Sequence, residues 1–294
     1  MELAVVSKKE KQAPLPDVLA AHVDEHNAHT QVGGYKDLSR YSAVGDVDGI
    51  TLGFEIECEY RHRRDLYWND WDSENYMENS EEDALKAISN SMNMGYVLAE
   101  RDGSLHDTGI EFVTGYCTWK SHKPRLERFF TEYKKDFEED GGAGIHIHIG
   151  RNEYTHDLSF RHLYWFIMCD ENEPLIEYVA RRYDTEYCHA DRSYDWSMDI
   201  DDPDRYDAVN ARRYTYELRL FDSTTNFLQL QQYAEFAIAC VEFLIKNKTA
   251  TNTFIADEGR DFSKSPIYYK RFIEFVSNKA ARFPNLHGHL ENLK

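Results

Sequence analysis

Two histidines, His146 and His148, stand in the run Gly144–Ile149, where isoleucine occupies every other position. Alternate side chains of a β-strand share one face, so this spacing places both imidazoles opposite the isoleucines. Imidazoles paired on one strand face are typical of metal ligands. A histidine pair on a water-facing strand is the alternative, and the spacing alone leaves both interpretations open.

Acidic residues alternate with apolar ones in three other runs, over residues 50–59, 109–114 and 214–220. The charged residues that these runs place on one side are Glu55, Glu57 and Glu59, then Glu111, then Glu217 with Arg219. Any antiparallel strand with one face in water shows such alternation, so each run by itself also fits a solvent-facing strand.

The four runs together favour a metal site. If they are neighbours in one sheet, several carboxylates and two imidazoles meet on one surface. Two carboxylates ~4 Å apart repel by ~4 kcal/mol at an effective dielectric constant of ~20, so such a cluster must protonate or bind cations. Carboxylates with one or two histidines suit Mg²⁺ or Mn²⁺, and no cysteine pair has the spacing of a zinc ribbon.

Magnesium held by carboxylates points to nucleotide chemistry. The sequence has neither the phosphate-binding loop of the P-loop enzymes nor a glycine-rich dinucleotide motif. We therefore expect nucleotide phosphates to be held by metal ions and by arginines, with Arg212, Arg213 and Arg219 as the candidates.

The elements that must position these residues can be placed along the chain. We predict helices over Ser80–Met94, Lys123–Glu139, Leu158–Tyr183 (interrupted near Pro174), Leu228–Lys246 and Ile267–Ala281. The arginines Arg181 and Arg182 are interpreted as a solvated helix end. Residues 62–83 and 184–208 are predicted loops. We predict an arm over 1–48, a catalytic sheet domain over 49–225, and C-terminal helices over 226–294 that pack on it.

The bulk properties limit the class of protein. The chain has 294 residues and a net charge of −19, which argues against direct nucleic-acid binding through phosphates. No apolar run approaches the length of a membrane span, and no signal peptide is evident. Five scattered cysteines fit free thiols in the cytoplasm, which is the expected location.

Five short motifs in order resemble those of the amidoligase family, relatives of glutamine synthetase and the glutamate–cysteine ligases. They are Phe54–Glu57, Glu100–Leu105, Gly109–Thr114, Gly142–Gly150, and Arg205–Asn210 followed by Tyr216–Arg219. The resemblance implies an α+β fold: a curved antiparallel sheet with helices packed on one face, like the catalytic domain of glutamine synthetase. It also implies an ATP-dependent ligase that joins a small-molecule or peptide carboxylate to an amine through an acyl phosphate, with Mg²⁺ or Mn²⁺.

The resemblance also implies residue roles. Glu57 with Glu111, and Glu100 or Asp102, would hold one metal, while Glu55, His146 and Glu217 would hold a second. His148 would lie near the nucleotide, Arg219 would face the acyl phosphate, and Arg212 or Arg213 would bind nucleotide phosphates. The base that accepts the proton of the amine is left open between Glu59 and Asp102.

Two other interpretations compete with a ligase. His146 and His148 followed by Glu153 have the spacing of the first cupin motif, which would make the chain a metal-dependent oxidoreductase. The downstream cupin histidine beside a Pro-x-Gly turn is missing. A non-catalytic descendant that binds a nucleotide or a partner protein is the second alternative, which the retained charged residues argue against.

Overall fold

The structure is a computed structural model that describes residues 43–60, 97–100, 109–133, 137–138, 143–182, 188, 206–255 and 262–293. The predicted helix Ser80–Met94 and the predicted loop 62–83 lie outside these residues, as do most of the predicted arm and loop 184–208. The predicted division into domains stays a prediction.

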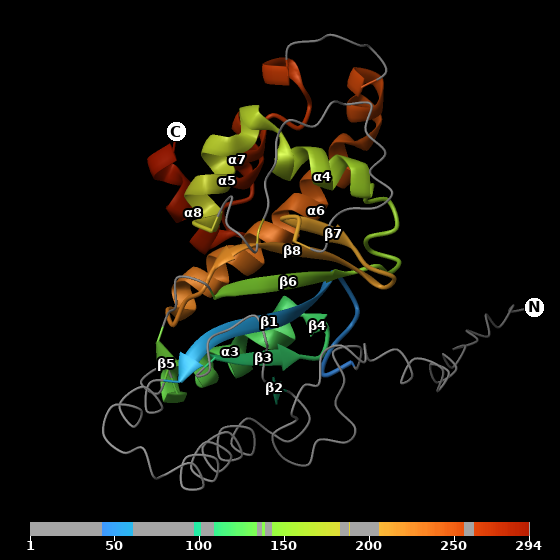
Figure 1. Cartoon of the computed structure of the whole chain (residues 1–294). Helices are drawn as coiled ribbons and strands as arrows, with labels where there is room; N and C mark the ends of the chain where they lie inside the picture. The colour runs from blue at the N-terminus through green and yellow to red at the C-terminus, as the bar shows by residue number, and fades with distance from the viewer. Residues whose placement is uncertain are drawn as a thin grey trace, which may run out of the picture.

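The described residues form one open, curved, antiparallel sheet (Figure 1). Its strands are β1 Thr51–Tyr60, β2 Val97–Glu100, β3 Gly109–Thr114, β4 Cys117–Thr118, β5 Phe137–Glu138, β6 Gly144–Gly150, β7 Val209–Ala211 and β8 Thr215–Asp222. The order across the sheet is β2-β3-β1-β6-β8-β7, and the two short strands β4 and β5 both pair with β1. The four runs predicted to carry charged residues are thus the four neighbours β3, β1, β6 and β8.

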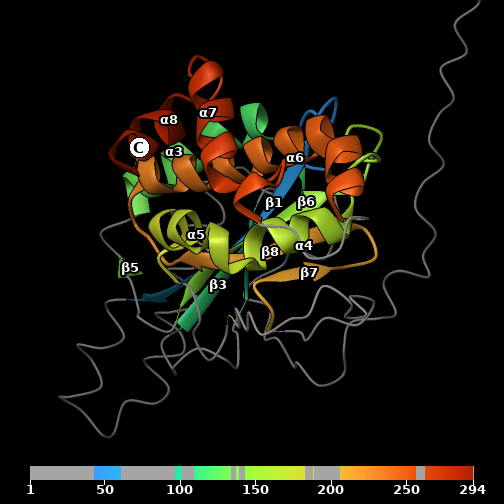
Figure 2. The ribbon, with the colours of Figure 1, turned by 90° about the horizontal axis from the view of Figure 1, so that it is seen from above.

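Helices cover the apolar side of this sheet. They are α3 Trp119–Tyr133, α4 Phe160–Met168, α5 Glu173–Ala180, α6 Phe227–Ile255, α7 Tyr269–Asn278 and α8 Pro284–Leu290. Figure 2 shows α3, α6, α7 and α8 on one side of the sheet, with α4 and α5 lying over its β8 end. The predicted α+β class, an antiparallel sheet with packed helices, is therefore confirmed. Among the described helices, none is long and apolar enough to cross a membrane.

The alternation read from the sequence explains the core. Isoleucines 145, 147 and 149 of β6 are fully buried, as is Leu52 of β1. From α6, the ring of Tyr233 stacks on Phe221 of β8 with 4.6 Å between the ring centroids. Apolar side chains on one face of each strand thus pack against the helices, which leaves the charged side chains on the opposite face.

Several predicted element ends were wrong. Helix α3 starts at Trp119 rather than Lys123 and ends at Tyr133, and the strand β5 follows where the prediction continued the helix to Glu139. The ring of Phe137 in β5 packs on Phe112 of β3 with 5.1 Å between centroids. Burial of this ring against the sheet outweighs the local helical pattern. Helix α6 continues to Ile255, nine residues beyond the predicted end at Lys246.

Candidate functional site

The strand register brings the predicted charged residues together on one face. Glu57 of β1 lies opposite Glu111 of β3, and Glu55 of β1 lies opposite His146 of β6. On the other side of β6, His148 lies opposite Glu217 of β8. Directly opposed residues of an antiparallel pair have their Cβ atoms about 4.5–5.5 Å apart, so these side chains are neighbours.

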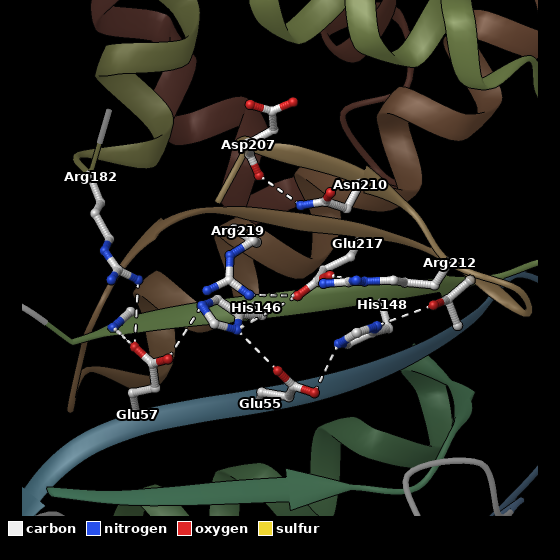
Figure 3. A network of polar contacts seen from close by, with 12 residues as sticks. Glu55, Glu57, His146, His148, Arg182, Asp207, Asn210, Arg212, Glu217 and Arg219 are labelled. Atoms are coloured by element: carbon white, nitrogen blue, oxygen red, sulfur yellow. Dashed lines mark hydrogen bonds and ion pairs between the residues drawn. The ribbon is translucent and has the colours of Figure 1, made fainter. Parts of the chain in front are cut away.

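His146 lies at the centre of this polar cluster (Figure 3). Its Nδ1 atom is 3.0 Å from Glu55 Oε2 and 3.9 Å from Glu217 Oε1, and its Nε2 atom is 3.4 Å from Glu57 Oε1. All four side chains are buried. His148 extends the cluster, with Nε2 3.1 Å from Glu55 Oε1 and Nδ1 3.2 Å from Thr215 Oγ1.

Two arginines hold the carboxylate of Glu217. Arg212 donates from Nε to Oε2 at 2.7 Å, and Arg219 donates from Nη1 to Oε1 at 2.9 Å. Between Leu218 and Phe221, β8 spans three steps where β6 spans only two, from Ile145 to Ile147. This irregularity is a β-bulge, a feature that re-aims side chains beside functional sites, and it lies next to Arg219.

The structure places a third arginine, Arg182, at the other end of the cluster. The chain leaves α5 through Arg181, which has a left-handed backbone with φ of 65°. Arg182 follows, is buried, and places Nη1 3.5 Å from Glu57 Oε2, while the N–H of Gly144 donates to the same oxygen at 2.6 Å. The sequence interpretation of Arg182 as part of a solvated helix end was wrong, because the helix end turns towards the sheet.

Asn210 of β7 is a further polar residue that the sequence analysis did not single out. It lies opposite Glu217 in the pairing of β7 with β8, and it is buried. Its side-chain amide donates to the backbone carbonyl of Asp207 at 2.9 Å, as Figure 3 shows. Asn210 ends the motif Arg205–Asn210, and this position in a family-like motif could have indicated that it belongs to the site.

The charges of the cluster affect the ionisation of Glu217. Burial acts to raise the pKa of its carboxyl group, but the charges of His148, His146 and Arg219 outweigh burial and lower the pKa from its usual value. Burial likewise acts to lower the pKa of Arg219, and the carboxylates of Glu217 and Glu57 raise it instead. Glu217 is therefore held as a carboxylate and Arg219 as a cation.

Glu55, His146 and Glu217 fit a divalent metal ion. Each offers one ligand atom, these atoms lie within 4.8 Å of one another, and all three residues are buried. Two carboxylate oxygens and one imidazole nitrogen form a ligand set suited to Mn²⁺ or Mg²⁺. Glu57 and Glu111 lie beside this group on the same face and could hold a second ion.

The remaining predicted residues lie elsewhere or outside the described part. Arg213 is exposed and its guanidinium lies 5.0 Å from the ring centroid of Tyr214, so the structure does not place it with the cluster. It follows Arg212 in the turn between β7 and β8, where neighbouring side chains diverge. Asp102 lies outside the described residues, and for Glu59 and Glu100 only the backbone, in β1 and β2, is described.

No protein-family model matches the chain, and no curated protein matches it at a significant level.

Proposed function

We propose that this protein is an ATP-dependent carboxylate–amine ligase whose sheet corresponds to the catalytic sheet of the amidoligases and glutamine synthetase. The observation that carries the proposal is the buried group of Glu55, His146 and Glu217, contributed by three neighbouring antiparallel strands. Residue types, order along the chain and shared face agree with what the motif resemblance implies.

The residues divide into two metal-binding groups under this proposal. Glu55, His146 and Glu217 would hold one divalent ion, and Glu57 with Glu111 would hold another. When bound, the ions neutralise the charge on the phosphates of ATP. His148, at the more exposed end of the cluster, would lie beside the nucleotide, and Arg212 is the candidate for a nucleotide phosphate.

The first chemical step forms the acyl phosphate. An oxygen of the substrate carboxylate bonds to the γ-phosphorus of ATP, the bond from that phosphorus to the β–γ bridging oxygen breaks, and ADP leaves. Arg219 is fixed by Glu217 and keeps its positive charge, so it can stabilise charge on the transferred phosphoryl group without reorganising.

The second step forms the amide. The amine nitrogen bonds to the acyl carbon, the bond from that carbon to the phosphate oxygen breaks, and inorganic phosphate leaves. The nitrogen loses a proton to a base, for which Glu59 and Asp102 stay open candidates. The amine and the carboxylate are small molecules or peptides.

The cupin alternative receives less support. Its metal site needs Glu153 beside His146 and His148, but Glu153 is exposed and lies beyond the end of β6. The described strands also form a single sheet covered by helices, whereas a cupin is a double-sheet jelly roll.

The activity is tested by incubating the protein with ATP, Mg²⁺ or Mn²⁺, and panels of amino acids and polyamines, with ADP release as the first readout. A mass increase equal to the joined substrates less one water identifies the product. ADP release that depends on both a carboxylate and an amine is expected. Its absence with every pair would favour the non-catalytic alternative.

A matched pair of variants tests the residue assignment. We expect Glu217→Gln to lower the turnover number by at least about a hundredfold, the loss typical when one preorganised electrostatic contact to the transition state is removed. Glu153→Gln makes the same chemical change at an exposed position and should leave turnover within about twofold, since surface substitutions have small effects. An equal loss of turnover in the two variants would contradict the assignment of Glu217 to the active site.

A further inference from the structure

Both oxygens of Glu217 already accept hydrogen bonds from arginine, although Glu217 belongs to the group that fits a metal ion. Arg212 Nε lies 2.7 Å from Oε2 and Arg219 Nη1 lies 2.9 Å from Oε1. A divalent ion bound at Glu217 would sit beside two guanidinium groups, and like charges at short distance repel. Binding of the ion therefore favours departure of one arginine.

The two arginines differ in their freedom to leave. The side chain of Arg219 is only 14% exposed and projects from the bulged part of β8, whereas the side chain of Arg212 is 46% exposed. Arg212 lies between β7 and β8, where its backbone N–H bonds to the carbonyl of Thr215 at 2.9 Å. The side chain of Arg212 therefore has water beside it to turn into, whereas the side chain of Arg219 is mostly enclosed by protein.

The charge balance of the cluster points the same way. Among the side chains that the structure describes, its carboxylates are those of Glu55, Glu57, Glu111 and Glu217, and its guanidinium groups are those of Arg182, Arg212 and Arg219. In this described set, four carboxylates face three guanidinium groups, which leaves little excess negative charge before the imidazoles are counted. Departure of one arginine restores the negative charge that a divalent ion needs.

We propose that Arg212 is a latch that competes with the divalent ion for Glu217. Arg212 binds Glu217 in the structure. A bound ion would take its place on Glu217, and the guanidinium would then be available to an anionic group of the incoming substrate. The inference rests on the proposed metal centre. Binding of the ion frees Arg212 for the anion, and binding of the anion frees Glu217 for the ion. Each ligand therefore raises the affinity of the protein for the other.

The latch predicts the sign of a change in metal affinity. Mn²⁺ binding to the full chain, without nucleotide, is measured by calorimetry and by the loss of the free Mn²⁺ electron paramagnetic resonance signal. We expect Arg212→Gln to bind Mn²⁺ about two- to fivefold more tightly than wild type, which corresponds to removal of an ion pair with one exposed partner. If Arg212 instead positions Glu217 for the metal, the same variant binds more weakly.

Two controls separate the latch from general electrostatics. Arg213→Gln removes the same charge one residue along, from a side chain that lies against Tyr214, and should change the affinity less. In a Glu217→Gln background, Arg212→Gln should have no effect, because the competition acts through Glu217. An equal gain in the Arg213 variant, or a persisting gain in the Glu217 background, would overturn the latch.

Adding sulfate at constant ionic strength tests whether Arg212 binds an anion after it leaves Glu217. It should tighten Mn²⁺ binding to wild type and not to Arg212→Gln; an unchanged wild type would contradict this half of the proposal. If wild type binds Mn²⁺ and Arg212→Gln binds it equally, the latch alone is wrong. If neither protein binds Mn²⁺, the proposed metal centre fails as well.

Discussion

At the scale of residues, Gly144 and Arg182 both contact the carboxylate of Glu57, and Arg182 lies so close to Gly144 that no larger residue fits at that position. A Cβ atom on Gly144 would lie 1.5 Å from Nη1 and 2.6 Å from Cζ of Arg182, and 3.0 Å from the carbonyl oxygen of Phe221. Gly144 also donates its N–H to Glu57. The glycine therefore permits the buried guanidinium to approach the carboxylate.

We expect Gly144→Ala to destabilise the protein by about 1–3 kcal/mol, because the added methyl group overpacks a buried site and displaces Arg182. Urea unfolding measures the change. Gly53→Ala is the matched control in β1, since a Cβ atom there would meet its nearest neighbour, His148 Cβ, at 3.7 Å. Equal stability of the two variants would show that Arg182 adjusts without cost.

The acidic residues and histidines of the cluster were predictable from sequence, as were Arg212 and Arg219, but Arg182 was not. Strand alternation places Glu55 and Glu57 on one face of β1. Burial of the three isoleucines of β6 turns His146 towards the same side of the sheet, since a register slip of one residue would expose them. Arg182 follows a helix, and its direction depends on the left-handed turn at Arg181 and on a glycine in a distant strand. Local sequence carries no signal for such a contact.

At the scale of elements, α6 and α8 are tied together by one carboxylate. Glu235 of α6 accepts the backbone N–H groups of Asn285 and Leu286, at 3.0 and 2.9 Å, and the side-chain amide of Asn285 at 2.6 Å. These backbone groups belong to the first turn of α8, whose N–H groups have no partner within the helix. Glu235 thus fixes where α8 begins.

We expect Glu235→Ala to destabilise the protein by about 1–3 kcal/mol, the cost of leaving buried donors without an acceptor. Thermal or urea unfolding at neutral pH measures it. Glu274→Ala, at an exposed position on α7, is the control and should change stability by less than about 0.5 kcal/mol. A similar loss in both variants would point to a general effect of charge rather than to this cap.

Helix existence was easier to predict than helix ends. The interruption near Pro174 is present, between Met168 and Glu173. The end of α3 depends on Phe137, whose ring is buried by β3 and α3, and such long-range packing leaves no local trace.

At the scale of the whole molecule, His122 joins the helical layer to the sheet behind the polar cluster. This residue of α3 is fully buried, and its Nε2–H donates to the carbonyl of Leu52 in β1 at 2.8 Å. Its ring meets Phe54 edge-on, with 5.0 Å between centroids. Burial lowers the pKa of His122 from 6.5 to about 4, so the folded protein holds it neutral.

This lowered pKa makes stability depend on pH. As pH falls, His122 takes up a proton in the unfolded chain before it does so in the folded protein. The contribution of neutral His122 to the free energy of unfolding is therefore complete above pH 6.5 and is lost as pH falls towards about 4. We expect His122 to contribute about 3 kcal/mol to the loss of stability between pH 7 and pH 4. His122→Gln, which keeps a donor for Leu52, should lose less stability over this range in urea titrations.

The exposed His156 provides the control, and His156→Gln should follow the wild-type pH dependence. If His122→Gln also shows the wild-type pH dependence, folding does not lower the pKa of His122, and this explanation of the pH dependence is wrong.

The sheet class was predictable at this scale, but the strand order was not. Period-two alternation in four runs indicates strands, and helical periodicity after residue 226 indicates helices. Nothing local says that β6 lies between β1 and β8, because pairings between distant segments depend on how the whole core packs.

The polar cluster is not uniformly enclosed. Side-chain exposure rises from 3% at Arg182 through 14% at Arg219 and 18% at His148 to 46% at Arg212. If the cluster binds a divalent ion as proposed, we expect the ion to enter beside Arg212 and the β7–β8 hairpin, where the described side chains of the cluster are most exposed. Electrostatic attraction strengthens from that end inward as the surroundings become less polarisable. Under the proposed function, a ligand would therefore meet the Arg212 end of the cluster before the Arg182 end, which is buried.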